Sequence, residues 1–181
     1  MIKKIVALTM AAVLAAVSFT SCSKVKTPEK QESFDVTTKE IVNVVMLLND
    51  GRSMEFELYP KIAPITVQNF VDLATSGFYD GLTFHRIVSN FVVQGGDPKG
   101  NGTGGPGWNI KGEFSSNGVK NDLKHTRGVL SMARSMAPDS AGSQFFIMHD
   151  DAPHLDGQYA AFGKVVEGME VVDEIAETAT D

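Results

Sequence analysis

The 181-residue chain has a single cysteine, Cys22, few basic residues and only a short strongly apolar run. A lone cysteine cannot form an internal disulfide. The apolar run at 5–17 is thirteen residues long, whereas a membrane-spanning helix needs about 20. Lys and Arg number 16 against 22 Asp and Glu, a net charge of −6. This acidic balance argues against a nucleic acid as partner.

Residues 1–21 are typical of a secretion signal. Lys3 and Lys4 precede the apolar run, and the small residues of Phe19-Thr20-Ser21 lead into Cys22. We therefore expect a lipoprotein signal peptide at 1–21, cleaved before a lipidated Cys22. The protein would then be anchored by its lipid in a bacterial cell envelope, facing the periplasm. An ordinary signal peptide with an incidental cysteine is the alternative.

The rest of the chain divides into a linker and one domain. Residues 22–40 are rich in Lys, Thr, Glu, Gln and Ser, which predicts a flexible tether. Residues 41–181 show no internal repeat and are enough for one globular core. Cleavage would remove Lys3 and Lys4 but no acids, leaving 14 basic against 22 acidic residues and a net charge of −8.

The pattern of the domain is mainly that of strands. Apolar and polar residues alternate over 53–58, which predicts a half-buried strand. The preceding Asn49-Asp50-Gly51 predicts a hairpin turn that pairs this strand with 42–48. A helix is expected from Pro64 to about Gly77, and a second near 169–176. Short apolar runs between glycine-rich loops are typical of a closed antiparallel sheet.

The segment 84–96 places Arg86 and Gln94 among apolar side chains. A guanidinium is always charged and cannot act as a base. If Arg86 is catalytic, it must therefore act by donating hydrogen bonds or through its charge. Such a segment suits chemistry on a neutral, apolar substrate.

Three blocks of sequence, in order, closely resemble the cyclophilin family of peptidyl-prolyl cis-trans isomerases, in its small bacterial form. The resemblance extends from about Val42 to Ile175. The blocks are Phe84 to Asp97 with the following Asn101-Gly102-Thr103-Gly104-Gly105, then Gly142-Ser143-Gln144-Phe145-Phe146-Ile147, and Leu155-Asp156-Gly157 leading to Phe162-Gly163-Lys164-Val165.

The resemblance implies a mainly β fold: an eight-stranded antiparallel barrel capped by two helices. Family members continue after the second helix into a strand that closes the barrel, whereas this sequence stops at Asp181. We therefore expect the final closing strand to be missing. An open sheet edge would then remain unless the tether or another chain covers it.

The resemblance also implies the activity and its site. Arg86 matches the catalytic arginine, a buried donor that would hydrogen-bond the prolyl nitrogen while the peptide bond is twisted. No cofactor and no metal is needed, and the partners would be proline-containing unfolded or flexible polypeptides. The expected substrate-binding residues are Phe91, Val92, Gln94, Ala133, Arg134, Gln144, Phe146, His154, Leu155 and Tyr159.

Two of these positions differ from the best-known eukaryotic members. His154 stands where those members often have Trp, and Tyr159 stands where they have His. Because the indole contributes to the binding of cyclosporin-type macrocycles, we expect weak cyclosporin binding. Tyr159 still supplies an aromatic wall with a polar tip.

Other interpretations of the motifs are weaker. Gly100, Gly102 and Gly105 fit a dinucleotide-binding pattern, but Pro106 follows where a helix should begin. The acids and histidines of 149–156 have no regular metal-ligand spacing, and Ser143 lacks the sequence context of a hydrolase nucleophile. The serious alternative is a non-catalytic Pro-peptide-binding or chaperone module, which would have no use for a donor such as Arg86.

Overall fold

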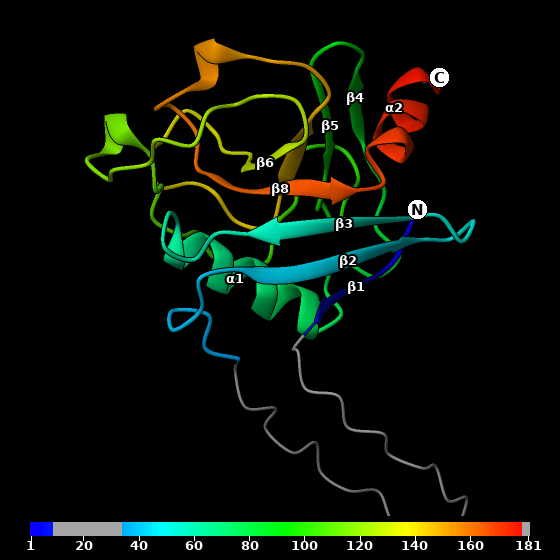
Figure 1. Cartoon of the computed structure of the whole chain (residues 1–181), viewed down its shortest axis with the longest axis horizontal. Coiled ribbons are helices and arrows are strands. Elements are labelled where there is room, and N and C mark those ends of the chain that lie inside the picture. The colour runs from blue at the N-terminus through cyan, green and yellow to red at the C-terminus, as the bar shows by residue number, and fades with distance from the viewer. Residues whose placement is uncertain (9–33, 179–181) are drawn as a thin grey trace, which may run out of the picture.

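A computed structural model describes residues 1–8 and 34–178. Its eight strands form one antiparallel sheet in the order β1-β2-β3-β8-β6-β7-β5-β4, curled into a half-barrel (Figure 1). The strands are β1 (Ile2–Leu8), β2 (Val42–Leu48), β3 (Ser53–Leu58), β4 (Arg86–Val88), β5 (Val92–Gly95), β6 (Val129–Met132), β7 (Phe145–Met148) and β8 (Ala161–Glu167). The helices are α1 (Pro64–Thr75) and α2 (Met169–Glu177), with short 3-10 turns η1 (Ser115–Asn117) and η2 (Pro153–Leu155). The prediction of a mainly β fold with eight antiparallel strands and two helices is confirmed.

The predicted hairpin forms between β2 and β3. Its register pairs Met46 with Met54, and both side chains are fully buried. Gly51 closes the turn at a φ of 92°, a conformation that glycine adopts without steric cost. The alternation over 53–58 and the turn that pairs it with 42–48 thus predicted the bounds of both strands.

Both helices lie where the sequence predicted them. α1 begins at Pro64, and its first free amides are capped from another part of the chain: the carboxylate of Glu113 accepts hydrogen bonds from Ile65 N at 3.1 Å and Thr66 N at 2.7 Å. α1 packs against β1, whereas α2 packs against β3, β4 and β5. No helix in the described part of the chain is long and apolar enough to cross a membrane.

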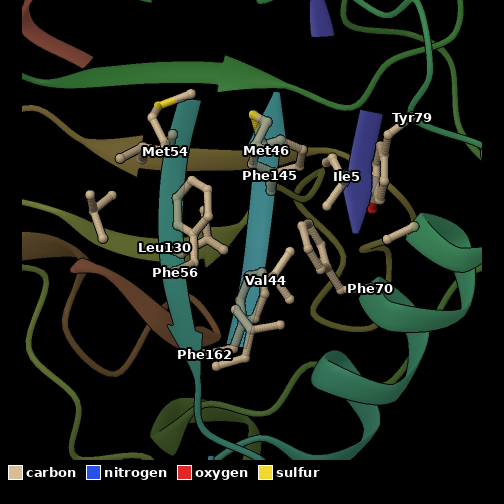
Figure 2. Close-up of a cluster of buried hydrophobic side chains, with 14 of the residues drawn as sticks. Ile5, Val44, Met46, Met54, Phe56, Phe70, Tyr79, Leu130, Phe145 and Phe162 are labelled. Carbon is tan, nitrogen blue, oxygen red and sulfur yellow. The ribbon is translucent and has the colours of Figure 1, made fainter. Parts of the chain in front are cut away.

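The main core fills the inside of the curled sheet (Figure 2). Phe70 of α1 lies at its centre, with ring centroids 5.1 Å from Tyr79, 5.4 Å from Phe145 and 5.3 Å from Phe162. A second, smaller cluster lies apart from it; its buried members are Val92, Val129, Phe146, Met148, Ala152, Leu155 and Ala161. The fold thus has a closed main core and this second cluster.

The edge of β2, which we expected to remain open, is occupied by β1. This strand comes from residues inside the predicted signal peptide. Ile2 and Ile5 are 0% and 1% exposed, and Ile2 also exchanges hydrogen bonds with the backbone of Gly81 and Leu82 at 2.7 and 2.8 Å. The N-terminus therefore supplies the strand beside β2. Cleavage at 21 stays a prediction, and Cys22 and the tether at 22–33 lie outside the described residues.

The folded unit begins before the predicted boundary at residue 41. Val36 is fully buried, and its N–H donates to Gln68 Oε1 at 3.1 Å. Gln68 Nε2 in turn donates to the carbonyl of Phe34 at 2.9 Å. Residues 34–40, predicted as the end of the tether, thus pack on α1.

Candidate active site

Strand register brings three of the predicted site residues into one row. Arg86 on β4 pairs with Gln94 on β5, and Gln94 pairs with Phe146 on β7. Residues directly opposite in neighbouring strands point to the same side of the sheet. The side chains of Arg86, Gln94 and Phe146 therefore share one face.

A chain of hydrogen bonds orders the polar side of this row. Arg86 Nη1 approaches Gln94 Oε1 at 3.5 Å, and Gln94 Nε2 donates to Gln144 Oε1 at 3.0 Å. Gln144 Nε2 then donates to the carbonyls of Gly102 and Gly104 at 3.0 and 2.8 Å. Because this chain ends on backbone carbonyls, it fixes which way each amide points.

Arg86 is exposed, not buried as expected. β4 is the last strand of the sheet and only three residues long, so no further strand pairs with its outer edge in the described part of the chain. The guanidinium lies over the ring of Phe91, 5.8 Å from its centroid, a cation–π contact that steadies the arginine. Arg86 thus lies exposed on the edge strand, against the ring of Phe91.

Eight of the ten residues expected to bind substrate line one cavity of about 220 Å³. Its floor is apolar: Val92, Phe146 and Leu155 are 2%, 5% and 8% exposed. The full lining consists of Arg86, Phe91, Val92, Gln94, Ala133, Arg134, Phe146, Leu155 and Tyr159. We call this cavity the proline pocket because of its size, its apolar floor and the role that the sequence predicted for it.

Two predicted residues lie just outside the proline pocket. Gln144 lines a neighbouring cavity of about 650 Å³, which shares Gln94, Ala133 and Arg134 with the pocket. His154 is exposed and stacks on Phe91 with the ring centroids 5.8 Å apart. His154 therefore supports the wall of the pocket from outside.

Arg134 holds the opposite wall. Its guanidinium lies 4.7 Å from the centroid of the Tyr159 ring, and Nε and Nη2 donate to the carbonyl of Gln158 at 3.1 and 2.9 Å. Tyr159 packs edge-on against Phe146 at 5.8 Å. The aromatic wall is thus clamped between a cation and the pocket floor.

A buried polar network behind the floor was missed by the sequence interpretation. His125 lies between Asp156 Oδ1, 3.1 Å from its Nδ1, and Ser131 Oγ, 3.0 Å from its Nε2. The imidazole stacks on Phe146 at 6.2 Å. No local pattern predicts this network, because Asp156 lies 31 positions from His125 in the sequence.

Burial shapes the protonation of this network. It lowers the pKa of His125, because the charged imidazolium is poorly solvated there. Partial burial acts in the opposite direction on Asp156, but hydrogen bonds from His125 and Lys124 hold the pKa of this carboxyl below its usual range. The Asp156–His125–Ser131 contacts follow the order of a hydrolase triad. They cannot act as one, because Ser131 is 0% exposed and cannot meet a substrate.

The other weak interpretations find no support in the geometry. Ser143 is buried and donates to the carbonyl of Gly96 at 2.7 Å. The glycine-rich loop wraps around Asp97, which accepts from the amides of Lys99 and Asn101 at 2.7 and 3.0 Å, so a carboxylate already occupies the place a phosphate would need. Within the described residues, no three His, Cys, Asp or Glu side chains come together as a metal site.

Comparison with known proteins agrees with this geometry. Residues 43–181 match the family model for cyclophilin type peptidyl-prolyl cis-trans isomerase/CLD. The chain is 56% identical over 124 residues to peptidyl-prolyl cis-trans isomerase B of Bacillus subtilis (strain 168), covering 68% of this chain and 83% of that protein. It is 50% identical over 125 residues to a peptidyl-prolyl cis-trans isomerase of Helicobacter pylori (strain ATCC 700392 / 26695), covering 68% and 74%.

A similar structure has also been solved. The fold matches the crystal structure of a cyclophilin type peptidyl-prolyl cis-trans isomerase of Cryptosporidium parvum with a TM-score of 0.71 and 35% identity, over 78% of this chain and 87% of that chain. A crystal structure of the same protein in the presence of the dipeptide Ala-Pro matches with a TM-score of 0.68 and 36% identity, over 76% and 86%. The chain belongs to the cyclophilin-type family and is a peptidyl-prolyl cis-trans isomerase.

Proposed function

We propose that the protein accelerates X-Pro isomerisation by hydrogen bonding from Arg86 to the prolyl nitrogen, with the proline ring held in the proline pocket. Rotation about a peptide bond costs roughly 18–20 kcal/mol because resonance is lost. In the twisted state the nitrogen regains a lone pair that the planar amide lacks. A donor aimed at this nitrogen stabilises the twisted state selectively, which is the binding that speeds the reaction.

The observation that carries this proposal is the placement of Arg86 at the mouth of an apolar cavity. A guanidinium has five N–H donors, and its contact with Gln94, at 3.5 Å, is the one side-chain hydrogen bond it makes within the described part of the chain. The remaining donors are free to meet a ligand. Arg134 differs, because its donors are already taken by the carbonyls of Gln158, Ser135 and Met136.

The remaining site residues have complementary roles in the proposal. Val92, Phe146 and Leu155 offer the proline ring a dry floor, and Phe91 and Tyr159 form its walls. Gln94 keeps the guanidinium oriented and Gln144 faces the substrate backbone. A related enzyme was crystallised in the presence of Ala-Pro, which supports proline-containing peptides as the substrates.

The test is isomerisation of a short Ala-Pro peptide by the full chain, compared with Arg86→Ala. Lys120→Ala is a matched control, because it removes another exposed cation, 87% accessible, that does not line the proline pocket. We expect acceleration that is lost in Arg86→Ala and kept in Lys120→Ala. A folded wild-type protein that binds the peptide without acceleration would instead favour the non-catalytic binding or chaperone module.

We further propose that the enzyme works in a bacterial cell envelope, anchored by a lipid on Cys22 and facing the periplasm. The basic residues, short apolar run and cysteine of the N-terminal sequence support this location. The reaction needs no ATP, which suits a compartment outside the cytoplasm. Intact-mass measurement should show loss of residues 1–21 and a lipid on Cys22, both abolished in Cys22→Ser.

Processing would have a structural consequence, because cleavage before Cys22 removes β1 from the sheet. Ile5→Ser separates the two states. In an uncleaved chain it should lower the free energy of unfolding by about 2–5 kcal/mol, since Ile5 is buried in the main core. In a chain that has lost residues 1–21 the substitution is gone with the leader and can have no effect on the mature domain.

A further inference from the structure

A third cavity lies on the outer side of α1, away from the proline pocket. It has a volume of about 510 Å³, and Ile65, Trp108 and Ile110 are among its lining residues. Ile65 is 44% exposed and Trp108 is 53% exposed. Large apolar side chains gathered around a surface cavity mark a binding surface more often than scattered ones do. The isomerase mechanism as proposed makes no use of them.

This cavity is linked to the proline pocket through an intervening cavity that shares lining residues with both. Trp108 lines both the 510 Å³ cavity and the 650 Å³ cavity. The 650 Å³ cavity in turn shares Gln94, Ala133 and Arg134 with the proline pocket. Three successive cavities with shared lining residues thus lead from Arg86 to Trp108, the arrangement that an extended polypeptide with its proline beside Arg86 would need.

Trp108 is held rigidly although half of it is exposed. Its indole N–H donates to Asn69 Oδ1 at 2.9 Å, and Asn69 Nδ2 donates to the carbonyl of Gly142 at 2.8 Å. The loop before it also lies against the same glycine, since a Cβ on Gly142 would come within 2.9 Å of Pro106 Cδ. Gly142 is two residues from Gln144, so the tryptophan is tied to the wall of the site.

The facing side of the cavity is equally fixed. Ile65 is in the first turn of α1, and its amide is held by Glu113 at 3.1 Å. The polar residues at this end satisfy one another, because Gln68 Nε2 donates to Asp72 Oδ1 at 2.8 Å. Asp72 is the one charged residue among the described lining residues of this cavity, and its carboxylate already accepts from Gln68. Two preorganised apolar side chains therefore face the occupant beside a single hydrogen-bonded carboxylate, which favours an apolar occupant.

We propose that Trp108, Ile65 and Ile110 form a distal subsite for a large apolar side chain of the same polypeptide whose proline lies at Arg86. The subsite would select substrates that carry such a residue several positions from the proline. The occupant is the substrate itself because the cavity between this subsite and the proline pocket shares lining residues with both. This inference rests on the proposed function of the pocket.

The chain has one tryptophan, so its fluorescence reports directly on this subsite. The probes are alanine-rich peptides with a single proline and one leucine moved stepwise along either side of it. At one spacing between proline and leucine, we expect a shift in Trp108 emission and a rise in kcat/KM of about 5- to 10-fold over the leucine-free peptide. Partial burial of a leucine side chain gives a binding gain of this size.

Ile65→Ser tests whether the preference comes from this cavity. The ratio of kcat/KM with and without leucine should fall to about 1 in this variant. Val166→Ser is the matched control: Val166 is 48% exposed on β8 and lines none of the three cavities, so the ratio should stay at the wild-type value. A preference that survives Ile65→Ser, or no preferred spacing at all, would overturn the subsite.

The design separates this inference from the proposed function. Turnover of the peptides with no preferred spacing would overturn the subsite and leave the isomerase intact. In Arg86→Ala we expect turnover to be lost while the leucine-dependent shift of Trp108 emission persists. A shift lost together with turnover in that variant would count against a subsite separate from Arg86.

Discussion

The main core and the second cluster are built from the same kinds of side chains but are closed to different degrees. In the main core, Phe70 touches other aromatic rings and is 0% exposed. In the second cluster, Phe91, Ala133 and Tyr159 are only half-buried. Its uncovered side is the proline pocket. The first cluster therefore stabilises the fold, whereas the second keeps apolar surface available for a ligand.

The two clusters also differ in their buried polar groups. In the main core, the hydroxyl of Tyr79 donates one hydrogen bond, to the carbonyl of Ser143 at 3.1 Å. The second cluster is supported by the His125 network, which contacts the ring of Phe146. Buried networks of this kind rigidify their surroundings when every member is satisfied. The open second cluster is therefore held in place by hydrogen bonds behind its floor as well as by apolar packing.

Phe70→Ala should give the largest loss of stability. Removing this ring from the centre of the main core should lower the free energy of unfolding by about 3–5 kcal/mol. Urea unfolding measures the loss, and kcat/KM of the fraction that remains folded should be unchanged. A selective loss of activity in the folded fraction would contradict the separation of the two clusters.

Phe146→Ala should reduce activity more than stability. Its ring borders the proline pocket, so we expect kcat/KM to fall about 10- to 100-fold as apolar contact with the proline is lost. Stability should fall less than in Phe70→Ala, because one side of the ring already faces the pocket. Turnover and urea unfolding should be measured for both variants. Equal losses of kcat/KM and equal losses of stability in Phe70→Ala and Phe146→Ala would contradict the different roles of the two clusters.

The His125 network should make stability depend on pH. Because burial lowers the pKa of His125 below its ordinary value of 6.5, the unfolded chain takes up a proton at a pH where the folded chain does not. The free energy of unfolding should therefore fall as the pH drops below about 6.5, down to the folded pKa. Urea unfolding at pH 7 and pH 5 should show a smaller difference in His125→Gln than in the wild type, and an equal difference would contradict this.

The smallest effect concerns cyclosporin, which we expect to inhibit weakly. His154 stacks on Phe91 outside the pocket and offers less apolar surface than an indole. His154→Trp should lower the inhibition constant by several-fold while leaving stability within about 0.5 kcal/mol, as for other exposed positions. Tight inhibition of the unchanged protein would show that His154 does not limit binding.

The sequence predicted the local elements well because local rules decide them. The alternation at 53–58, the turn at Gly51 and the start of α1 at Pro64 depend on neighbouring residues. The convergence of the pocket residues was predicted through the family resemblance and is seen in the structure, although Arg86 is exposed and not buried.

What the sequence did not predict depends on distant partners. β1 comes from residues with the pattern of a leader, and they form a strand by pairing with the edge of β2. Likewise, Val36 becomes part of the fold because Gln68 meets its amide. The contact of His125 with Phe146 and the exposure of Trp108 beside Ile65 depend on the finished fold.

The most direct test of the account measures binding and rotation in one experiment. Exchange NMR of an Ala-Pro peptide at increasing protein concentration gives both the dissociation constant and the rate of cis-trans interconversion on the protein. For Arg86→Ala we predict a rate at least about 100-fold lower, as for loss of one preorganised donor, with a dissociation constant within about threefold of the wild type. A full interconversion rate in Arg86→Ala would contradict the central role of this guanidinium.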